Sequence, residues 1–111
     1  MPVELTPSQA LGLWHSVSVS QVQSGDGDLT VRQLAILLQI YLKPPPHTVR
    51  GLAAMLNVTR ALDTMGARGL VDRVRDDRDR RNVIIKRTVT GALYLEKFGD
   101  VVIEKAHQLS Q

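Results

Sequence analysis

The sequence predicts a mostly α-helical, α+β fold in which helices surround a single two-stranded β-hairpin. Helix-capping motifs followed by apolar residues at helical spacing occur several times along the chain. Strand-forming residues around a charged turn occur together once, between residues 70 and 88. The chain has 111 residues and no internal repeat, which suits a modest core. We therefore expect a single domain over residues 1–111.

The first helix is expected over residues 7–23. Thr6 is a candidate N-cap, and Gln9 completes a capping box with it. The stretch from Ser16 to Val22 alternates with period two, which is typical of a strand, but no hairpin partner lies nearby. We therefore favour a helix, which ends at the Gly- and Asp-rich break that follows.

A second capping box, formed by Thr30 and Gln33, opens the next helix. Apolar side chains then occur on nearly all of its sides as far as Leu42. Such a helix is usually central and buried. The three consecutive prolines that follow end it, because proline cannot continue a helix.

A helix-turn-helix is expected over residues 48–69. Thr48 is a candidate cap for the segment VRGLAAMLN, and the residues that follow suggest a turn and a new cap at Thr59. In the next helix, apolar side chains at helical spacing face inward, whereas Arg60 and Thr64 face outward. The recognition helix of such a motif is the second one.

A β-hairpin is expected over residues 70–88, with its turn from Asp76 to Arg81. Between Arg60 and Arg87 there are nine basic and five acidic residues, so this quarter of the chain carries +4 against −1 elsewhere. Basicity concentrated in this way is typical of a surface that binds a polyanion.

A last helix is expected over residues 90–109, so that terminal helices at 7–23 and 90–109 flank the centre of the chain. Helix, tight turn, helix and hairpin in this order predict a winged helix-turn-helix. The hairpin is then the wing, which lies along the phosphate backbone beside a recognition helix in the major groove.

Four segments also carry a resemblance to a known family: LTVRQLAILLQIYL, TVRGLAAMLNV, TRALDTMGARGLVDR and RDDRDRRNVIIKRTVTG. Together, over about Leu29 to Gly91, they resemble the winged-helix transcriptional regulators of the MarR kind. The most specific part is the wing with the Thr-x-x-Gly that follows it. The resemblance implies a sequence-specific regulator of transcription that binds double-stranded DNA. It also implies a cytoplasmic homodimer and a small aromatic or anionic effector.

The resemblance places Asp79 and Arg81 on the Asp-Arg-Arg signature of the wing. In the family this aspartate orients an arginine that enters the minor groove. Arg78 and Arg80 stand beside the pair, and we expect them to contact phosphates.

The helix-turn-helix supplies the other expected contacts. Thr59, Arg60 and Thr64 are outward polar residues that are expected to reach base edges or phosphates. Thr48 lies at the N-terminus of the preceding helix and is expected to donate a hydrogen bond to a phosphate, because helix N-termini favour anions.

The recognition helix is shorter than the resemblance implies. The family usually has several more residues between LNV and TRALD, and a helix from Thr59 to Ala67 spans only about 13 Å at roughly 1.5 Å per residue. Two interpretations are open. Either the recognition helix is truncated, which weakens direct base readout, or a segment between Val58 and Thr59 is missing from the printed sequence.

Catalytic and metal-binding motifs do not occur in the sequence. There is no P-loop, dinucleotide fingerprint, nucleophile motif or cysteine, and the three histidines are widely separated. The aspartates of the wing turn alternate with arginines, which predicts salt bridges and not a calcium loop. No stretch has the length and apolarity of a membrane span, and the N-terminus lacks signal-peptide features. We expect no enzymatic activity, cofactor, metal or membrane contact.

A second function also stays open at this point. Winged helices serve as protein–protein interaction modules too, and the short recognition helix favours a module without DNA binding. A DNA binder is expected to be strongly salt-sensitive, whereas such a module uses an exposed apolar patch. We interpret the aromatic residues as core or dimer packing in preference to a ligand pocket; they are Trp14, Tyr41, Tyr94 and Phe98.

Overall fold

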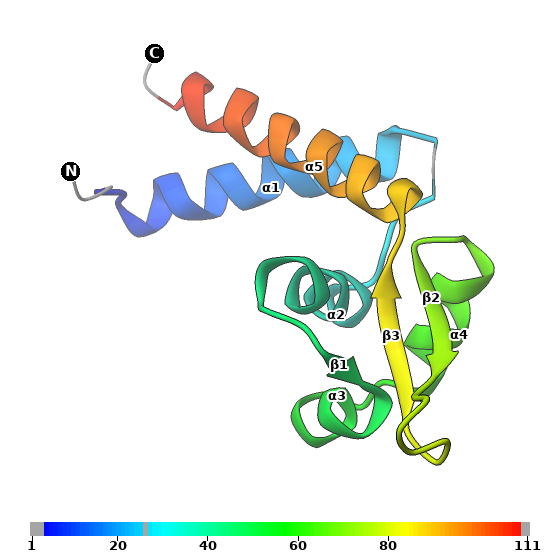
Figure 1. Ribbon diagram of the computed structural model, residues 1–111. Helices are drawn as coiled ribbons and strands as arrows, with labels where there is room; N and C mark the ends of the chain where they lie inside the picture. Colours follow the sequence, from blue (N-terminus) through cyan, green and yellow to red (C-terminus); the bar gives the residue numbers. More distant parts are fainter. Residues whose placement is uncertain (1–3, 26, 110–111) are drawn as a thin grey trace. The chain divides into compact units, whose positions relative to one another are not determined.

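The computed structural model describes residues 4–25 and 27–109 (Figure 1). Its elements follow the order α1, α2, β1, α3, α4, β2, β3 and α5. The chain divides into two compact units. The winged-helix unit comprises residues 29–95, and the terminal-helix unit combines the segment up to residue 28 with the segment from residue 96 onward. The expectation of one domain over residues 1–111 stays a prediction.

The terminal-helix unit contains α1, Pro7–Gln23, and the larger part of α5, Val89–Gln108. The Thr6 hydroxyl accepts a hydrogen bond from the Gln9 backbone N–H at 3.1 Å, and the Gln9 side chain accepts one from the Thr6 N–H at 2.9 Å. These bonds confirm the predicted capping box, and the helix has the predicted bounds. The strand interpretation of its second half is wrong.

The centre of the winged-helix unit is α2, Val31–Leu42, which begins with the predicted capping box between Thr30 and Gln33. Three of its side chains have no exposed surface: Ile36, Leu37 and Ile40. They belong to one buried cluster with side chains of α3, α4, β2 and β3. The prediction that the nearly all-round apolar helix is central is confirmed.

The sheet of this unit has three antiparallel strands in the order β1, β3, β2 (Figure 1). β2, Val71–Arg75, and β3, Val83–Arg87, form the predicted wing hairpin. β1, His47–Thr48, pairs with the other edge of β3 and extends the predicted two-stranded hairpin to a three-stranded sheet. Two residues are too few to show the alternation that identifies a strand in a sequence.

Both helices of the helix-turn-helix have ends that the sequence marks. Thr48 caps α3, Val49–Met55, as predicted, because its hydroxyl accepts a hydrogen bond from the Gly51 N–H at 2.9 Å. α4, Thr59–Ala67, is followed by Gly69, whose φ of +74° is a conformation that favours glycine.

α4 has the expected bounds from Thr59 to Ala67, but its N-cap differs from the prediction. The N-cap position belongs to Val58 and carries no side-chain cap, so the predicted cap at Thr59 is wrong. The Val58 carbonyl accepts the first helical hydrogen bond, from the Leu62 N–H at 2.9 Å. Val58 is buried in the core and sets the position of this first turn. α4 has nine residues, and both interpretations of its length stay open.

Tyr41 fastens the end of α2 to the start of α5. Its hydroxyl accepts a hydrogen bond from the Thr88 N–H at 2.9 Å and donates to the carbonyl of Thr88 at 3.0 Å or of Leu70 at 3.1 Å. The Thr88 hydroxyl accepts from the Gly91 N–H and donates to the Gly69 carbonyl. A Cβ at Gly91 has no space, because the Tyr41 hydroxyl and the Leu70 carbonyl occupy it. Packing therefore explains the Thr-x-x-Gly pattern.

Candidate nucleic-acid interface

The wing turn, residues 76–82, is shaped by its own aspartates. The Asp76 carboxylate accepts a hydrogen bond from the Arg78 backbone N–H at 3.0 Å, and the Asp79 carboxylate accepts one from the Arg81 N–H at 3.1 Å. Backbone hydrogen bonds of 2.9 and 3.1 Å close the same turn. The alternation of Asp and Arg thus produces a compact turn from which arginine side chains project.

Asp79 and Arg81 form an ion pair at this turn. The Arg81 Nε donates to Asp79 Oδ1 at 3.1 Å and its Nη2 donates to Oδ2 at 3.4 Å. The pKa of Asp79 is lowered, mainly by the side-chain hydrogen bond from Arg81 and then by the Arg81 backbone N–H. The carboxylate is therefore ionised at neutral pH and holds a guanidinium whose side chain is 89% exposed.

Arg78 and Arg80 are exposed at the same turn. Neither side chain has a hydrogen bond or ion pair to another residue that the structure describes. The Arg75 guanidinium, in contrast, donates to the Arg80 carbonyl at 3.0 Å and stabilises the turn. The wing therefore presents two uncommitted arginines beside one that is held by an aspartate.

The outer face of α4 presents Arg60 and Thr64, one helical turn apart and both exposed, as predicted. Between them, Asp63 pairs with Arg73 of β2 at 2.6 Å. This exposed pair contributes little stability, about 0–1 kcal/mol. It does hold the outer face of the recognition helix against the wing.

The predicted site contains two further threonines, Thr48 and Thr59. Thr48 lies at the junction of β1 and α3, and its hydroxyl already accepts a hydrogen bond as the cap of α3. The side chain of Thr59 lies outside the described part of the structure. The contacts of all eight predicted residues with DNA stay predictions.

Two basic residues have roles that the sequence did not indicate. Arg50, on α3, adds a smaller electrostatic contribution to the lowered pKa of Asp79, after those of Arg81. Arg87 donates through Nε to the Ile40 carbonyl and through Nη2 to the Lys43 carbonyl, both at 2.9 Å. Arg87 therefore satisfies the carboxyl end of α2 and belongs to the scaffold. A charge count alone cannot distinguish these roles.

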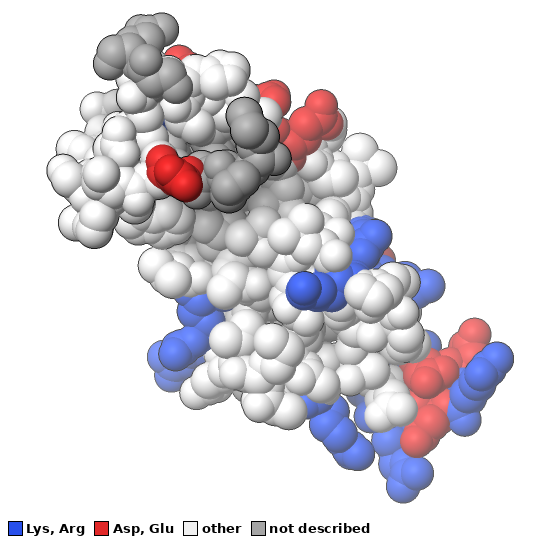
Figure 2. All heavy atoms as spheres, turned by 90° about the vertical axis from the view of Figure 1, so that its left-hand side faces the viewer, with Lys and Arg blue, Asp and Glu red and all other residues white. Residues whose placement is uncertain are grey.

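Charge separates strongly between the two units. The winged-helix unit has twelve basic and five acidic residues, a net charge of +7, whereas the terminal-helix unit has two basic and six acidic residues, a net charge of −4. Figure 2 shows one face of this distribution, with Lys and Arg side chains gathered on the winged-helix unit. A surface of this sign attracts polyanions.

The structure describes no alternative chemical centre. Within residues 4–25 and 27–109, no three His, Cys, Asp or Glu side chains are placed to hold a metal ion. His47 is 7% exposed, and its Nε2 makes a hydrogen bond of 3.1 Å with the Lys43 carbonyl, so its role is structural. Over the same residues, no helix combines the length and apolarity needed to cross a membrane.

The comparison with protein families agrees with the geometry of the wing. The model of the MarR family matches residues 29–83, which include the helix-turn-helix and the whole wing turn. Through these residues the chain belongs to the MarR family. No curated protein matches the chain significantly.

Solved structures share the MarR-family fold with this chain. A point mutant of S. aureus MepR is 22% identical with a TM-score of 0.75, over 96% of this chain and 83% of that one. The transcriptional repressor CouR, bound to a 23-mer DNA duplex, is 25% identical with a TM-score of 0.65, over 91% and 69%. Bordetella bronchiseptica BpsR, whose DNA binding is regulated by 6-hydroxynicotinic acid, is 17% identical with a TM-score of 0.62, over 98% and 84%.

Proposed function

We propose that this MarR-family protein is a sequence-specific regulator of transcription that binds double-stranded DNA. α4 lies in the major groove, and the wing arginines contact phosphates and the minor groove. The DNA-bound structure of CouR supports DNA as the partner. An interaction module without DNA binding is not favoured, because the solved relative CouR binds DNA and the wing presents exposed arginines.

The observation that carries the proposal is the Asp79–Arg81 pair. An arginine that enters a narrow minor groove is attracted by the negative potential there. Fixing its guanidinium beforehand lowers the entropy lost on binding. Because Asp79 makes both bonds while Arg81 remains exposed, the wing holds one arginine in a fixed orientation.

The recognition helix α4 is expected to contribute fewer contacts to DNA than the wing. α4 has nine residues, and of its described outward side chains only Arg60 and Thr64 are neither small nor engaged in an ion pair. Bidentate arginine contacts to guanine are the commonest specific contacts in the major groove. We assign this contact to Arg60, with Thr64 as a secondary contact to a base edge or phosphate.

The terminal-helix unit supports assembly as a homodimer. Three apolar side chains of α1 are largely exposed: Leu11 at 71%, Trp14 at 54% and Val22 at 68%. Contiguous exposed apolar surface marks an interaction site. A second copy of the chain is the partner that a symmetric pair of DNA half-sites requires.

We further propose a small aromatic or anionic effector. BpsR supports this, because 6-hydroxynicotinic acid regulates its binding to DNA. Tyr41 and Tyr94 are half-buried in the winged-helix unit, in agreement with their interpretation as packing residues. No effector contact is assigned to them.

Fluorescence anisotropy with a labelled duplex of about 30 base pairs, long enough for two half-sites one helical turn apart, tests DNA binding. Tight binding at low salt that weakens steeply at higher salt is the expected result. Selection of a preferred sequence from a random pool then tests specificity. An absence of binding at low salt would contradict the proposal and favour the protein–protein interaction module.

A further inference from the structure

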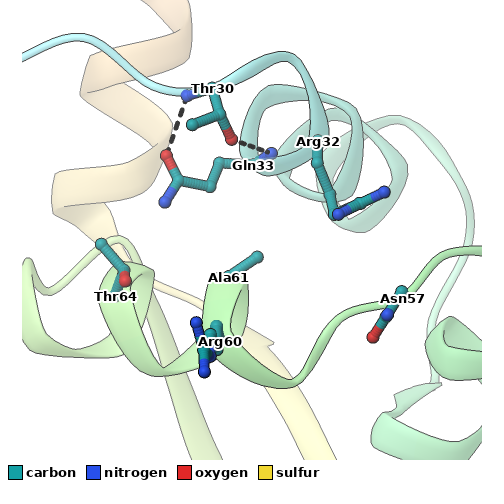
Figure 3. A pocket seen from close by; sticks show the side chains of 7 residues that line it. All are labelled: Thr30, Arg32, Gln33, Asn57, Arg60, Ala61 and Thr64. Carbon is teal, nitrogen blue, oxygen red and sulfur yellow. Dashed lines mark hydrogen bonds between the residues drawn. The ribbon is translucent and has the colours of Figure 1, made fainter.

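A groove lies between the start of α2 and the outer face of α4, within the winged-helix unit (Figure 3). Its volume is about 510 Å³. One water molecule takes about 30 Å³ in the liquid, so the groove admits a group much larger than solvent. Arg32 and Gln33 come from α2, and Arg60 and Thr64 come from α4 (Figure 3).

The two arginines of the groove make no polar side-chain interaction with the described part of the protein. Arg32 and Arg60 are both exposed, and neither has a hydrogen bond or ion pair to another described residue. They differ in this respect from Arg73 and Arg87, which are bound to protein oxygen atoms. The groove is therefore bordered by two guanidinium groups without a described protein partner, one from α2 and one from α4.

Apart from the arginines, the described side chains that line the groove are polar with the exception of Ala61, and none of them is a carboxylate. Its other described side chains are those of Thr30, Asn57 and Ala61. Pockets for apolar ligands are lined mainly by hydrophobic and aromatic side chains, whereas Ala61 is the one hydrophobic side chain in the described lining of this groove. Amide and hydroxyl groups beside arginines are suited to an oxyanion.

The position of Arg32 argues against a structural role. It stands in the first turn of α2, where the helix dipole disfavours a positive charge, and the first turn contains no acidic residue that offsets it. The Thr30–Gln33 box already satisfies the end of the helix without it. An anion in the groove removes this mismatch.

We propose that the groove between α2 and α4 binds a phosphodiester of the DNA backbone through Arg32 on its α2 wall, beside the base contact that Arg60 makes from the α4 wall. This contact lies outside the wing, and it compensates for the short recognition helix by adding phosphate contacts beside it. The inference rests on the proposed DNA-binding function. A free phosphate would satisfy the same chemistry, so the test separates the two sources.

The test compares Arg32→Gln with Lys43→Gln in salt-dependent anisotropy with duplex DNA. Both changes remove one positive charge from the α2 region, at the start of α2 and at its C-cap respectively. Glutamine has nearly the helix propensity of arginine, so Arg32→Gln is expected to keep the fold, which circular dichroism checks. We expect Arg32→Gln to flatten the log–log salt slope by about 0.9 per bound subunit and Lys43→Gln to leave it unchanged.

Three results overturn the inference in distinguishable ways. An unchanged slope in Arg32→Gln, with wild-type protein binding DNA, removes the groove contact and leaves the proposed function intact. Saturable binding of inorganic phosphate, measured by NMR without DNA, together with an unchanged slope assigns the groove to a free anion. Failure of the wild-type protein to bind DNA removes the proposed function and this inference with it.

Discussion

The winged-helix unit and the terminal-helix unit differ in the surface they leave exposed. The first carries +7 and has one buried apolar cluster around α2; its surface exposes arginines, together with apolar side chains such as Leu42 and Met55. The second carries −4, and its helix α1 exposes Leu11, Trp14 and Val22. The difference agrees with the separate tasks proposed for them: the winged-helix unit attracts a polyanion, and the terminal-helix unit offers apolar surface to a second copy of the chain.

Within the winged-helix unit, the arginines themselves fall into two groups. Arg73, Arg75 and Arg87 bind protein oxygen atoms and stabilise the scaffold. Arg78 and Arg80 have no partner among the described residues. The net charge therefore overstates the number of arginines available to DNA, and the contacts of each guanidinium decide its role.

The largest expected effect concerns the terminal-helix unit. Trp14→Glu places a charge on an apolar surface that a symmetric dimer buries twice. A buried Trp contributes on the order of 4 kcal/mol by area, so we expect dimerisation to weaken by at least 100-fold in analytical ultracentrifugation. Met55→Glu is the matched control, since Met55 is 60% exposed but lies in the winged-helix unit. Equal loss of dimer in both variants would contradict the assignment of the interface.

The next effect contrasts two glycines of the same helix, α5. Gly91→Ala forces a Cβ against the Tyr41 hydroxyl and the Leu70 carbonyl, and we expect a loss of about 3 kcal/mol in unfolding free energy. Gly99→Ala meets no atom within 4 Å and is expected to gain roughly 0.5–1 kcal/mol. Chemical denaturation measures both. A harmless Gly91→Ala would show that the close packing of Tyr41 does not fasten α2 to the start of α5.

A smaller effect is expected at the wing tip. Asp79→Asn removes a negative charge, which favours DNA binding in general, but it also removes the charged partner that orients Arg81. We expect affinity for arbitrary DNA to be retained and preference for the selected sequence to fall by about 1 kcal/mol. Competition binding between a duplex of arbitrary sequence and a duplex of the selected sequence measures both affinities. A parallel loss of both affinities would indicate that Asp79 acts only through folding of the turn.

The smallest effect is the response of the same pair to pH. Because the folded pKa of Asp79 is lowered, its contribution to stability is fully present above the ordinary Asp pKa near 3.9 and is lost as pH falls through the lowered value. The Arg81 Nε–H resonance in NMR is therefore expected to stay constant between about pH 7 and 5. A shift in that range would show that the carboxylate is not held as described.

The capping motifs made most of the fold predictable. Thr6 with Gln9 and Thr30 with Gln33 are local signals, and the structure confirms both boxes. The cap of α4 was misjudged because its N-cap position is held by Val58, whose burial is a tertiary effect. β1 was missed because two residues carry no periodic pattern.

The site was predictable at the wing and much less so elsewhere. The Asp79–Arg81 pair lies within three residues, so its spacing is visible in the sequence. The roles of Arg87 and Tyr41 depend on partners 29 to 47 positions away in sequence, and that of Arg73 on one 10 positions away. The groove of Arg32 and Arg60 exists only once α2 and α4 are packed, and no local pattern indicates it.

The most direct test of the account is the salt dependence of DNA binding by Arg80→Ala and Arg81→Ala beside the wild-type protein. Each phosphate contact contributes about −0.9 to the log–log slope, so either variant is expected to bind more weakly and to flatten the slope by about one unit for each bound subunit. Slopes that match the wild type in both variants would contradict the assignment of the wing as a DNA-binding element.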